Sequence, residues 1–351
     1  MTPLERCLAV LNDEIPDRIP VLPQAFLFAV ETAGCTMAEV NRDAGRMAKA
    51  QILSQEKFGY DGCIVDFDDA SLAEACGAKV IYRENEPAVV DENEPLLKHL
   101  EAIGDLSLPD PNTSPRLQHW LETTRILADK IGDHVFIMGR ADQGAFSLAC
   151  LLRGIGQFMT DIVTEDPETI QNLLVYCRNA CALFAKAQKD AGAHATSIGD
   201  ALAGPNLISP EMYALFAYEH EKILTGEVQS YGIPLSLHIC GDTTSIIAKM
   251  ASTNAKILEI DSSVDIREAK KQCGSKTVLM GNIDPADPLV LGTADGVERI
   301  AKSIIQQSKG RGLFLSSGCA MGRNTKPENV QAMVRAAKKY GTRDRIMEMN
   351  R

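Results

Sequence analysis

The sequence predicts an α/β fold, a (β/α)8 TIM barrel with an N-terminal helical extension and an inserted β-hairpin. Short apolar runs alternate along the chain with amphipathic segments of helical period, which is the pattern of strand–helix units that pair into a parallel sheet. Eight such runs are present, and barrels of about this length fold as one domain, so we expect residues 1–351 to form a single domain. No Gly-x-Gly-x-x-Gly motif follows the first strand, which disfavours the alternative of an open nucleotide-binding sheet.

The predicted elements begin with a short amphipathic helix from Leu4 to Leu11. Eight predicted strands follow, over residues 18–23, 63–67, 135–139, 195–200, 234–239, 256–260, 277–281 and 312–316. Predicted helices lie between them, over residues 37–58, 116–131, 146–152, 156–165, 167–191, 209–231, 243–252, 265–273 and 292–309, and a closing helix covers residues 327–340. Ser114 and Ser209, each followed by proline, are expected to cap two of these helices.

Residues 75–95 interrupt this alternation directly after the second strand. Two short runs, Val80 to Tyr82 and Ala88 to Val90, mix apolar and polar residues and are separated by Asn85 and Pro87. Such runs joined by turn-forming residues predict a β-hairpin. We therefore expect a hairpin inserted into the barrel at about residues 75–95.

Composition and charge exclude several classes of protein. The net charge of −11 and the lack of a basic run argue against a nucleic-acid-binding surface. No apolar stretch reaches the roughly 18 residues of a membrane span, and the N-terminus lacks the layout of a signal peptide, so we expect a cytoplasmic protein. The ten cysteines have no regular spacing, and we expect most to be reduced core residues, including Cys177 and Cys181 on one helix.

The residues that carry chemistry are expected at the carboxyl ends of the strands, where barrel enzymes place their active sites. The stretch Leu235–Gly241 has the pattern of a buried strand that runs into a turn, and it carries His238 and Cys240. Residues i and i+2 of a strand point to the same face, so these two side chains would lie next to each other. They can form half of a tetrahedral zinc site, and Asp261 and Cys319, at the ends of two later strands, are candidates for the other half.

Other interpretations of these residues stay open on residue chemistry alone. A cysteine beside a histidine can form a nucleophilic pair, which is the main competitor to zinc binding. An isolated cysteine is most often a core residue. A zinc ion held here could also be structural, in a protein whose function is binding rather than catalysis.

Several segments carry a resemblance to a known family. The two most extensive are Leu237–Thr244 and Ser317–Val330, and shorter matches over nearly the whole chain are Asp17–Val21, Ala193–Asp200, Ile208–Met212 and Met280–Asn282. On these motifs the sequence resembles the uroporphyrinogen decarboxylase superfamily. Within that superfamily it is similar to the corrinoid-dependent methyltransferase branch, typified by methylcobamide:coenzyme M methyltransferase.

The resemblance implies a zinc ion and a ligand set for it. In the family the metal is held by a His-x-Cys pair, a distant cysteine and an acidic residue, and these correspond by position to His238, Cys240, Cys319 and Asp261. Glu259 is the alternative for the acidic ligand, because it lies two residues before Asp261 and would share its face of the strand.

The resemblance also implies the activity, which is transfer of a methyl group from a methylated corrinoid to an acceptor thiol such as coenzyme M. The chain lacks the corrinoid-holding motif Asp-x-His-x-x-Gly, so we expect a separate corrinoid protein to carry methylcobalamin and to dock over the barrel mouth, with the 75–95 hairpin as a candidate contact. Asp200 and Gln143 are expected either to orient the substrate or to order the mouth.

Three other activities are compatible with the resemblance. The protein could demethylate a substrate and load the corrinoid protein, or it could transfer the methyl group to tetrahydrofolate. It could also be a uroporphyrinogen decarboxylase, but that enzyme grips the substrate propionates with an early arginine-rich motif. The corresponding stretch here, Arg18–Phe26, lacks an arginine cluster, which disfavours this alternative.

Overall fold

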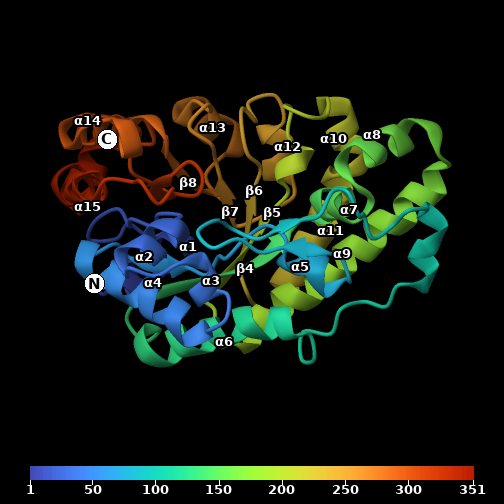
Figure 1. Cartoon of the computed structure of the whole chain (residues 1–351). Coiled ribbons are helices and arrows are strands. Elements are labelled where there is room, and N and C mark those ends of the chain that lie inside the picture. Colours follow the sequence, from blue (N-terminus) through green and yellow to red (C-terminus); the bar gives the residue numbers. More distant parts are fainter.

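Seven parallel strands form one curled sheet in a computed structural model that describes residues 1–351. Figure 1 shows this sheet at the centre of the molecule, with helices arranged around it. The architecture confirms the predicted α/β barrel. The strands, each hydrogen-bonded to the next, are β1 (Gly62–Ile64), β4 (Phe136–Gln143), β5 (Ala195–Gly199), β6 (Leu235–His238), β7 (Ile257–Glu259), β8 (Val278–Ile283) and β9 (Leu313–Ser317).

The first predicted strand, residues 18–23, forms only two isolated bridges, and the one at Val21 joins the two edges of the sheet. Val21 pairs in parallel with Leu315 of β9, and the amide of Leu22 donates to the Leu315 carbonyl at 2.9 Å. On the other side, the amide of Asp61, which precedes β1, donates to the Val21 carbonyl at 2.7 Å. The two prolines of this segment have no N–H to donate, which keeps the pairing short.

The predicted helices appear in the predicted order but not always with the predicted length, and three further helices, Phe26–Thr32, Ser71–Ala75 and Arg343–Met349, were not predicted. The helices are α1 (Pro3–Leu11), α2 (Phe26–Thr32), α3 (Met37–Val40), α4 (Ala44–Phe58), α5 (Ser71–Ala75), α6 (Pro115–Ile131), α7 (Ala145–Arg153), α8 (Ile155–Thr164), α9 (Pro167–Asp190), α10 (Pro210–Phe216), α11 (Tyr218–Ser230), α12 (Ile247–Ser252), α13 (Ile266–Cys273), α14 (Ala294–Gln307), α15 (Pro327–Tyr340) and α16 (Arg343–Met349). Short 3-10 turns cover Leu100–Asp105 and Ala201–Ala203, and a π-helical turn covers Asp287–Leu291.

Two predicted helices are interrupted in the structure. Residues 37–58 form α3 and α4, because Asp43 is extended (φ −145°) and its carboxylate accepts a hydrogen bond from the Arg46 amide to cap α4. Residues 209–231 form α10 and α11, which are separated at Ala217. The apolar period continues across both breaks, so periodicity alone merged each pair into one helix. The predicted N-terminal helix is confirmed as α1, with Thr2 as its cap.

The predicted insertion is confirmed as an antiparallel hairpin of β2 (Val80–Ile81) and β3 (Val89–Val90). Its tip reaches the loop that follows β9, where the guanidinium of Arg323 donates to the Asn85 carbonyl at 3.3 Å. The hairpin therefore contacts the carboxyl end of the barrel, next to the segment that carries Cys319.

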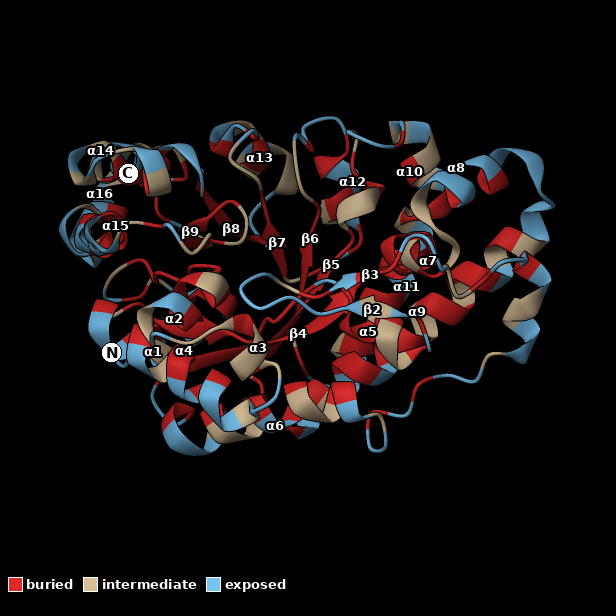
Figure 2. Ribbon diagram, viewed as in Figure 1, coloured by how far each residue is buried: buried red, intermediate tan, exposed pale blue.

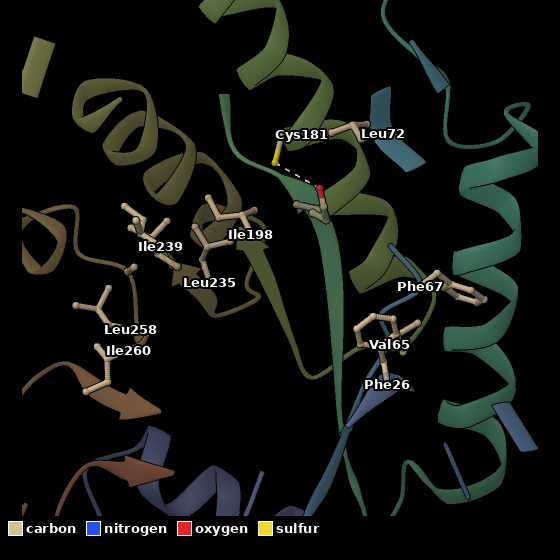
Figure 3. Packing of buried hydrophobic residues seen from close by; sticks show 14 of the residues in the cluster. Phe26, Val65, Phe67, Leu72, Cys181, Ile198, Leu235, Ile239, Leu258 and Ile260 are labelled. Atoms are coloured by element: carbon tan, nitrogen blue, oxygen red, sulfur yellow. Dashed lines mark hydrogen bonds between the residues drawn. The ribbon is translucent and has the colours of Figure 1, made fainter. Parts of the chain in front are cut away.

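The apolar core has two parts. The larger cluster, of 89 buried residues, lies between the sheet and the surrounding helices, and Figure 2 shows the buried strands and the exposed outer faces of the helices. Figure 3 shows part of this cluster, in which Cys181 of α9 points at a carbonyl of β4. Cys177 and Cys181 are both fully buried there, as predicted.

The smaller cluster fills the interior of the barrel near the amino-terminal ends of the strands. Residues of α1 pack against the inward-facing side chains of the strands, so α1 covers the amino-terminal end of the barrel. The members of this cluster are Cys7, Val10, Leu11, Leu22, Ile64, Phe136, Met138, Ala195, Ile257, Val278, Met280 and Phe314.

A buried carboxylate holds the bridging segment in place. Asp61 is fully buried and accepts hydrogen bonds from Arg6 (2.6 Å), from both terminal nitrogens of Arg18 (2.8 and 2.9 Å) and from the amide of Val21 (2.7 Å). One side chain thus connects α1, the bridging segment and the start of β1.

No single helix of the chain is long and apolar enough to span a membrane, although the bent pair α7 and α8 passes that test by length and composition.

Candidate metal centre

A polar layer lies above the apolar filling of the barrel. The inward-facing positions change from apolar to polar along each strand, for example from Met138 to Arg140 in β4 and from Ile257 to Glu259 in β7. Because side chains alternate along a strand, the residues two positions further on point into the same space. This layer is where the carboxyl ends of the strands bring distant residues together.

Three of the four predicted metal ligands converge at this end of the barrel. His238 is the last residue of β6, Cys240 follows it in the turn, and Cys319 follows β9. The His238 Nε2 lies 3.1 Å from the Cys240 Sγ and 3.8 Å from the Cys319 Sγ, and the two sulfur atoms are 3.8 Å apart. A tetrahedral zinc ion with bonds of about 2.0 Å to nitrogen and about 2.3 Å to sulfur places its ligand atoms roughly 3.5 Å apart. The observed spacing fits such a site.

The orientation of the histidine ring also fits a metal ligand. The Nδ1 of His238 lies 3.1 Å from the backbone carbonyl of Glu259, so this nitrogen carries the proton and donates it. The Nε2 then presents a lone pair to the two sulfurs. A second hydrogen bond of this kind is the usual way in which proteins fix the tautomer of a metal-binding histidine. His238 is buried, whereas Cys240 and Cys319 are half-buried, which leaves one side of the cluster accessible.

The two thiols do not ionise alike. A hydrogen bond from the Cys240 thiol lowers the pKa of Cys319, although burial opposes this. The hydrogen bond to Cys319 and burial raise the pKa of Cys240. Cys319 is therefore the thiol of the pair that ionises first, and thiolate is the form of cysteine that binds metals.

The structure does not bring Asp261 into this cluster. Its carboxylate accepts hydrogen bonds from the amide of Gly241 (3.2 Å), from Ser262 (3.3 Å) and from the amide and hydroxyl of Ser263 (both 2.9 Å). These bonds lower the pKa of Asp261 although burial opposes this. β7 ends at Glu259, so the strand alternation that placed Asp261 on the ligand face does not extend to it.

The carboxylate of Glu259 lies inside the barrel. It accepts hydrogen bonds from Ser197 and from Ser236 (2.7 Å), and its second oxygen has no partner. Glu259 thus contributes its carbonyl oxygen to His238 and keeps its carboxylate one layer below the thiols.

Arg140 belongs to the site although the sequence analysis did not include it. Its guanidinium is buried at 3.3 Å from Asp66 and 3.7 Å from Asp69, and its Nε and Nη1 have no hydrogen-bond partner. The predicted third strand ended at Gly139, whereas β4 continues to Gln143 and carries Arg140 into the barrel. The feature of the sequence that could have indicated Arg140 is a single arginine directly after an apolar run.

The two other predicted site residues have clear structural partners. Asp200 is fully buried, and its carboxylate accepts hydrogen bonds from the amides of Ser147 (2.7 Å) and Phe146 (3.4 Å) at the start of α7. The amide side chain of Gln143 donates to Asp69 (2.9 Å) and to Asp142 (3.2 Å). These contacts tie the start of α7 and the loop after β1 to the strand ends.

Asp200 gives a prediction about pH. Burial raises its pKa to about 6, above its ordinary value near 3.9, so between these values the folded chain binds more protons than the unfolded chain. The contribution of this carboxyl to stability therefore falls as the pH rises through that window. We expect the wild type to lose up to about 3 kcal/mol relative to Asp200→Asn between about pH 4 and about pH 7. Urea unfolding of the zinc-free proteins measures this difference, and a difference independent of pH would contradict it.

Gly318 gives a prediction about metal affinity. A Cβ at this position would lie 2.6 Å from the backbone amide nitrogen of Ser262, which has no room to move aside. We expect Gly318→Ala to displace the neighbouring Cys319 and to weaken zinc binding by about tenfold or more, with the fold intact. Gly322→Ala is the matched control, because a Cβ there has no heavy atom within 4 Å. Competition with a chelator measures both affinities, and equal affinities would refute the prediction.

The chain is similar to known proteins along nearly its whole length. The uroporphyrinogen decarboxylase (URO-D) family model matches residues 2–340. The methylcobamide:CoM methyltransferase MtbA of Methanosarcina mazei is 30% identical over 97% of this chain and 98% of its own length. The methylcobamide:CoM methyltransferase MtaA of Methanosarcina barkeri is 28% identical over 95% of this chain and 97% of its own length.

A solved structure extends the similarity to three dimensions. A methyltransferase from Methanosarcina mazei has a TM-score of 0.88 and 25% identity, covering 97% of this chain and 99% of that chain. The family model and these matches each span nearly the whole length. The chain therefore belongs to the uroporphyrinogen decarboxylase family, as a member of its methyltransferase branch.

Proposed function

We propose that this protein transfers a methyl group from a methylated corrinoid, carried by a separate protein, to a small acceptor thiol. The observation that carries the proposal is the convergence of the His238 imidazole with the thiols of Cys240 and Cys319 at the barrel mouth, where both cysteines are partly accessible. A structural zinc site is closed by four protein ligands, whereas a catalytic one has three and an open position. The relatives named methylcobamide:CoM methyltransferases support the same reaction.

In this proposal His238, Cys240 and Cys319 would hold a zinc ion at the barrel mouth, where the acceptor thiol would bind. Zinc bound there lowers the pKa of a coordinating thiol, which makes the nucleophilic thiolate available at neutral pH. In the overall reaction a carbon–sulfur bond forms and the cobalt–carbon bond breaks, methyl-Co(III) becomes Co(I), and the thiol proton goes to solvent. Asp261 is the candidate for an exchangeable fourth ligand, and it would have to release the Gly241 amide to reach the metal.

The surroundings of the cluster have three roles in the proposal. The Glu259 carbonyl orients His238. The hydrogen bonds of Asp200 and Gln143 hold the start of α7 and the loop after β1 around the mouth. The 75–95 hairpin, whose tip contacts Arg323, is the candidate contact for the corrinoid protein.

A tetrapyrrole decarboxylase is a poorer fit to this site. Its substrate carries many carboxylates and needs several free cations. Arg18 begins the stretch Arg18–Phe26, which corresponds to the arginine-rich motif of the decarboxylase. Its guanidinium donates two hydrogen bonds to the buried Asp61 and is not free to bind a substrate. The mouth itself is lined by carboxylates, among them Asp66 and Asp69, which pair with Arg140.

One assay tests the proposal and its alternatives. The zinc-loaded protein is mixed without oxygen with methylcobalamin and one acceptor at a time: coenzyme M, methanethiol, homocysteine or tetrahydrofolate. Absorbance follows the conversion of methylcobalamin to cob(I)alamin. We expect turnover with a thiol, its loss after zinc removal and its return when zinc is added. Turnover with tetrahydrofolate alone, or turnover that survives zinc removal, would overturn the proposal.

A further inference from the structure

A polar hollow lies at the end of the barrel opposite the metal-binding cluster. It forms where α13 and α14 end and the chain returns to β8 and β9, at the amino ends of these strands. Its volume is about 670 Å³, and no hydrophobic residue lines it. Five cations do line it, namely Arg267, Lys270, Lys271, Lys309 and Arg311.

The positive charge of this hollow is only partly neutralised. Arg311 lies 3.2 Å from Asp13, and Lys271 lies 3.7 Å from Glu268, which precedes it by one helical turn. The other three cations form no ion pair with a carboxylate within 4.0 Å. Such a concentration of cations is opposite in sign to the net charge of −11 of the whole chain. Unpaired like charges that face one space attract an anion into it.

Helix electrostatics accounts for three of these cations. Lys270 and Lys271 lie in the last turn of α13, and Lys309 directly follows Ser308, the C-cap of α14, where positive charge is favourable. Arg267 lies in the first turn of α13, where positive charge is unfavourable. Arg311 lies outside any helix. Helix electrostatics therefore does not explain why Arg267 and Arg311 also lie around this hollow.

Lys270 is held at the hollow by backbone groups. Its ammonium nitrogen donates to the carbonyls of Gly312 (3.1 Å) and Thr277 (3.4 Å), at the entries to β9 and β8. A Cβ at Gly312 would lie 2.7 Å from this nitrogen, so glycine makes the space for the lysine. An ammonium has three N–H bonds, and two carbonyl partners leave one for a further acceptor.

We propose that this hollow binds a small hydrophilic polyanion, a phosphorylated compound that contains a pyrophosphate-like group. Arginine and lysine together are the side chains that bind phosphate oxygens through charge-assisted hydrogen bonds. The volume is that of a small-molecule site, and the lack of apolar lining leaves no platform for an aromatic ring or a nucleobase. This site is independent of the proposed methyl transfer.

Inorganic pyrophosphate is the probe that tests the site. Titration calorimetry on the full-length, zinc-free protein is expected to give one binding site, because zinc removal prevents chelation from contributing heat. Each charge-assisted hydrogen bond lost corresponds to about tenfold in affinity, so Arg267→Gln with Lys309→Gln should weaken binding by about a hundredfold. Both side chains are exposed, so the double variant is expected to fold.

The control is Lys338→Gln, which removes an exposed lysine from the last turn of α15, outside the hollow. It should bind pyrophosphate like the wild type, and so should Cys319→Ala. Equal affinity of the wild type and the double variant, equal weakening by Lys338→Gln, or no binding by the wild type would overturn the proposal. None of these results bears on methyl transfer, which is measured at the other end of the barrel.

Discussion

Cys319→Ala is expected to lose zinc and methyl transfer while the protein stays folded. Cys319 is one of the two sulfur donors, and its Sγ lies 3.8 Å from both the Cys240 Sγ and the His238 Nε2. A hydrogen bond from the Cys240 thiol lowers the pKa of Cys319, so it is the thiol of the pair that ionises first. Alanine leaves one sulfur and one nitrogen, too few ligands for a zinc site of either kind. Zinc should fall from about one per chain to near zero, and turnover by about a hundredfold or more.

Zinc content by plasma mass spectrometry, the methylcobalamin assay and circular dichroism measure the three parts of this prediction. Cys35→Ala is the matched control, because Cys35 is also a half-buried free cysteine but is not part of the cluster. Its zinc content and turnover should equal those of the wild type. Full activity of Cys319→Ala would remove this residue from the site.

Asp61→Asn is expected to destabilise the protein by about 3 to 5 kcal/mol. The fully buried carboxylate accepts hydrogen bonds from Arg6, from Arg18 and from the amide of Val21, which bridges the two edges of the sheet. Asparagine removes the negative charge and places N–H donors opposite two guanidinium groups. The cost is large because the half-buried Arg18 loses its carboxylate partner and the buried Arg6 keeps only Asp17.

Urea unfolding followed by circular dichroism measures this change in the free energy of unfolding. Glu122→Gln is the comparison, since Glu122 forms an exposed ion pair with Arg125 at 3.2 Å, and such pairs contribute about 0.2 to 1 kcal/mol. If Asp61→Asn changed stability no more than Glu122→Gln, the barrel would not depend on this buried cluster.

Most of the fold was predictable because most of the strands can be recognised from their own sequence. β5, β6, β7 and β8 are buried apolar runs bounded by turns, and they appear within a few residues of the predicted ranges. The segment around Val21 has an equally apolar sequence but forms only isolated bridges. What decides its pairing is the buried Asp61, 40 residues away in the chain, and no local pattern reveals such a contact.

Only those site residues that lie at or next to the ends of strands could be placed from the sequence. His238 ends a strand, so the alternation rule places Cys240 beside it, and the barrel order brings the end of β9 to the same mouth. Asp261 lies beyond the end of the short β7, where loop hydrogen bonds rather than alternation set its direction. Arg140 was missed because the extent of β4 depends on pairing with its neighbours, not on its own apolar run.

X-ray absorption at the zinc edge, with and without an acceptor thiol, tests the central claim most directly. If His238, Cys240 and Cys319 hold a zinc ion whose open position takes the thiol, the metal alone should show two sulfur ligands together with nitrogen or oxygen ligands. Addition of the thiol should then give a third sulfur at about 2.3 Å. A shell that does not change when the thiol is added, or one that contains no sulfur, would contradict the account.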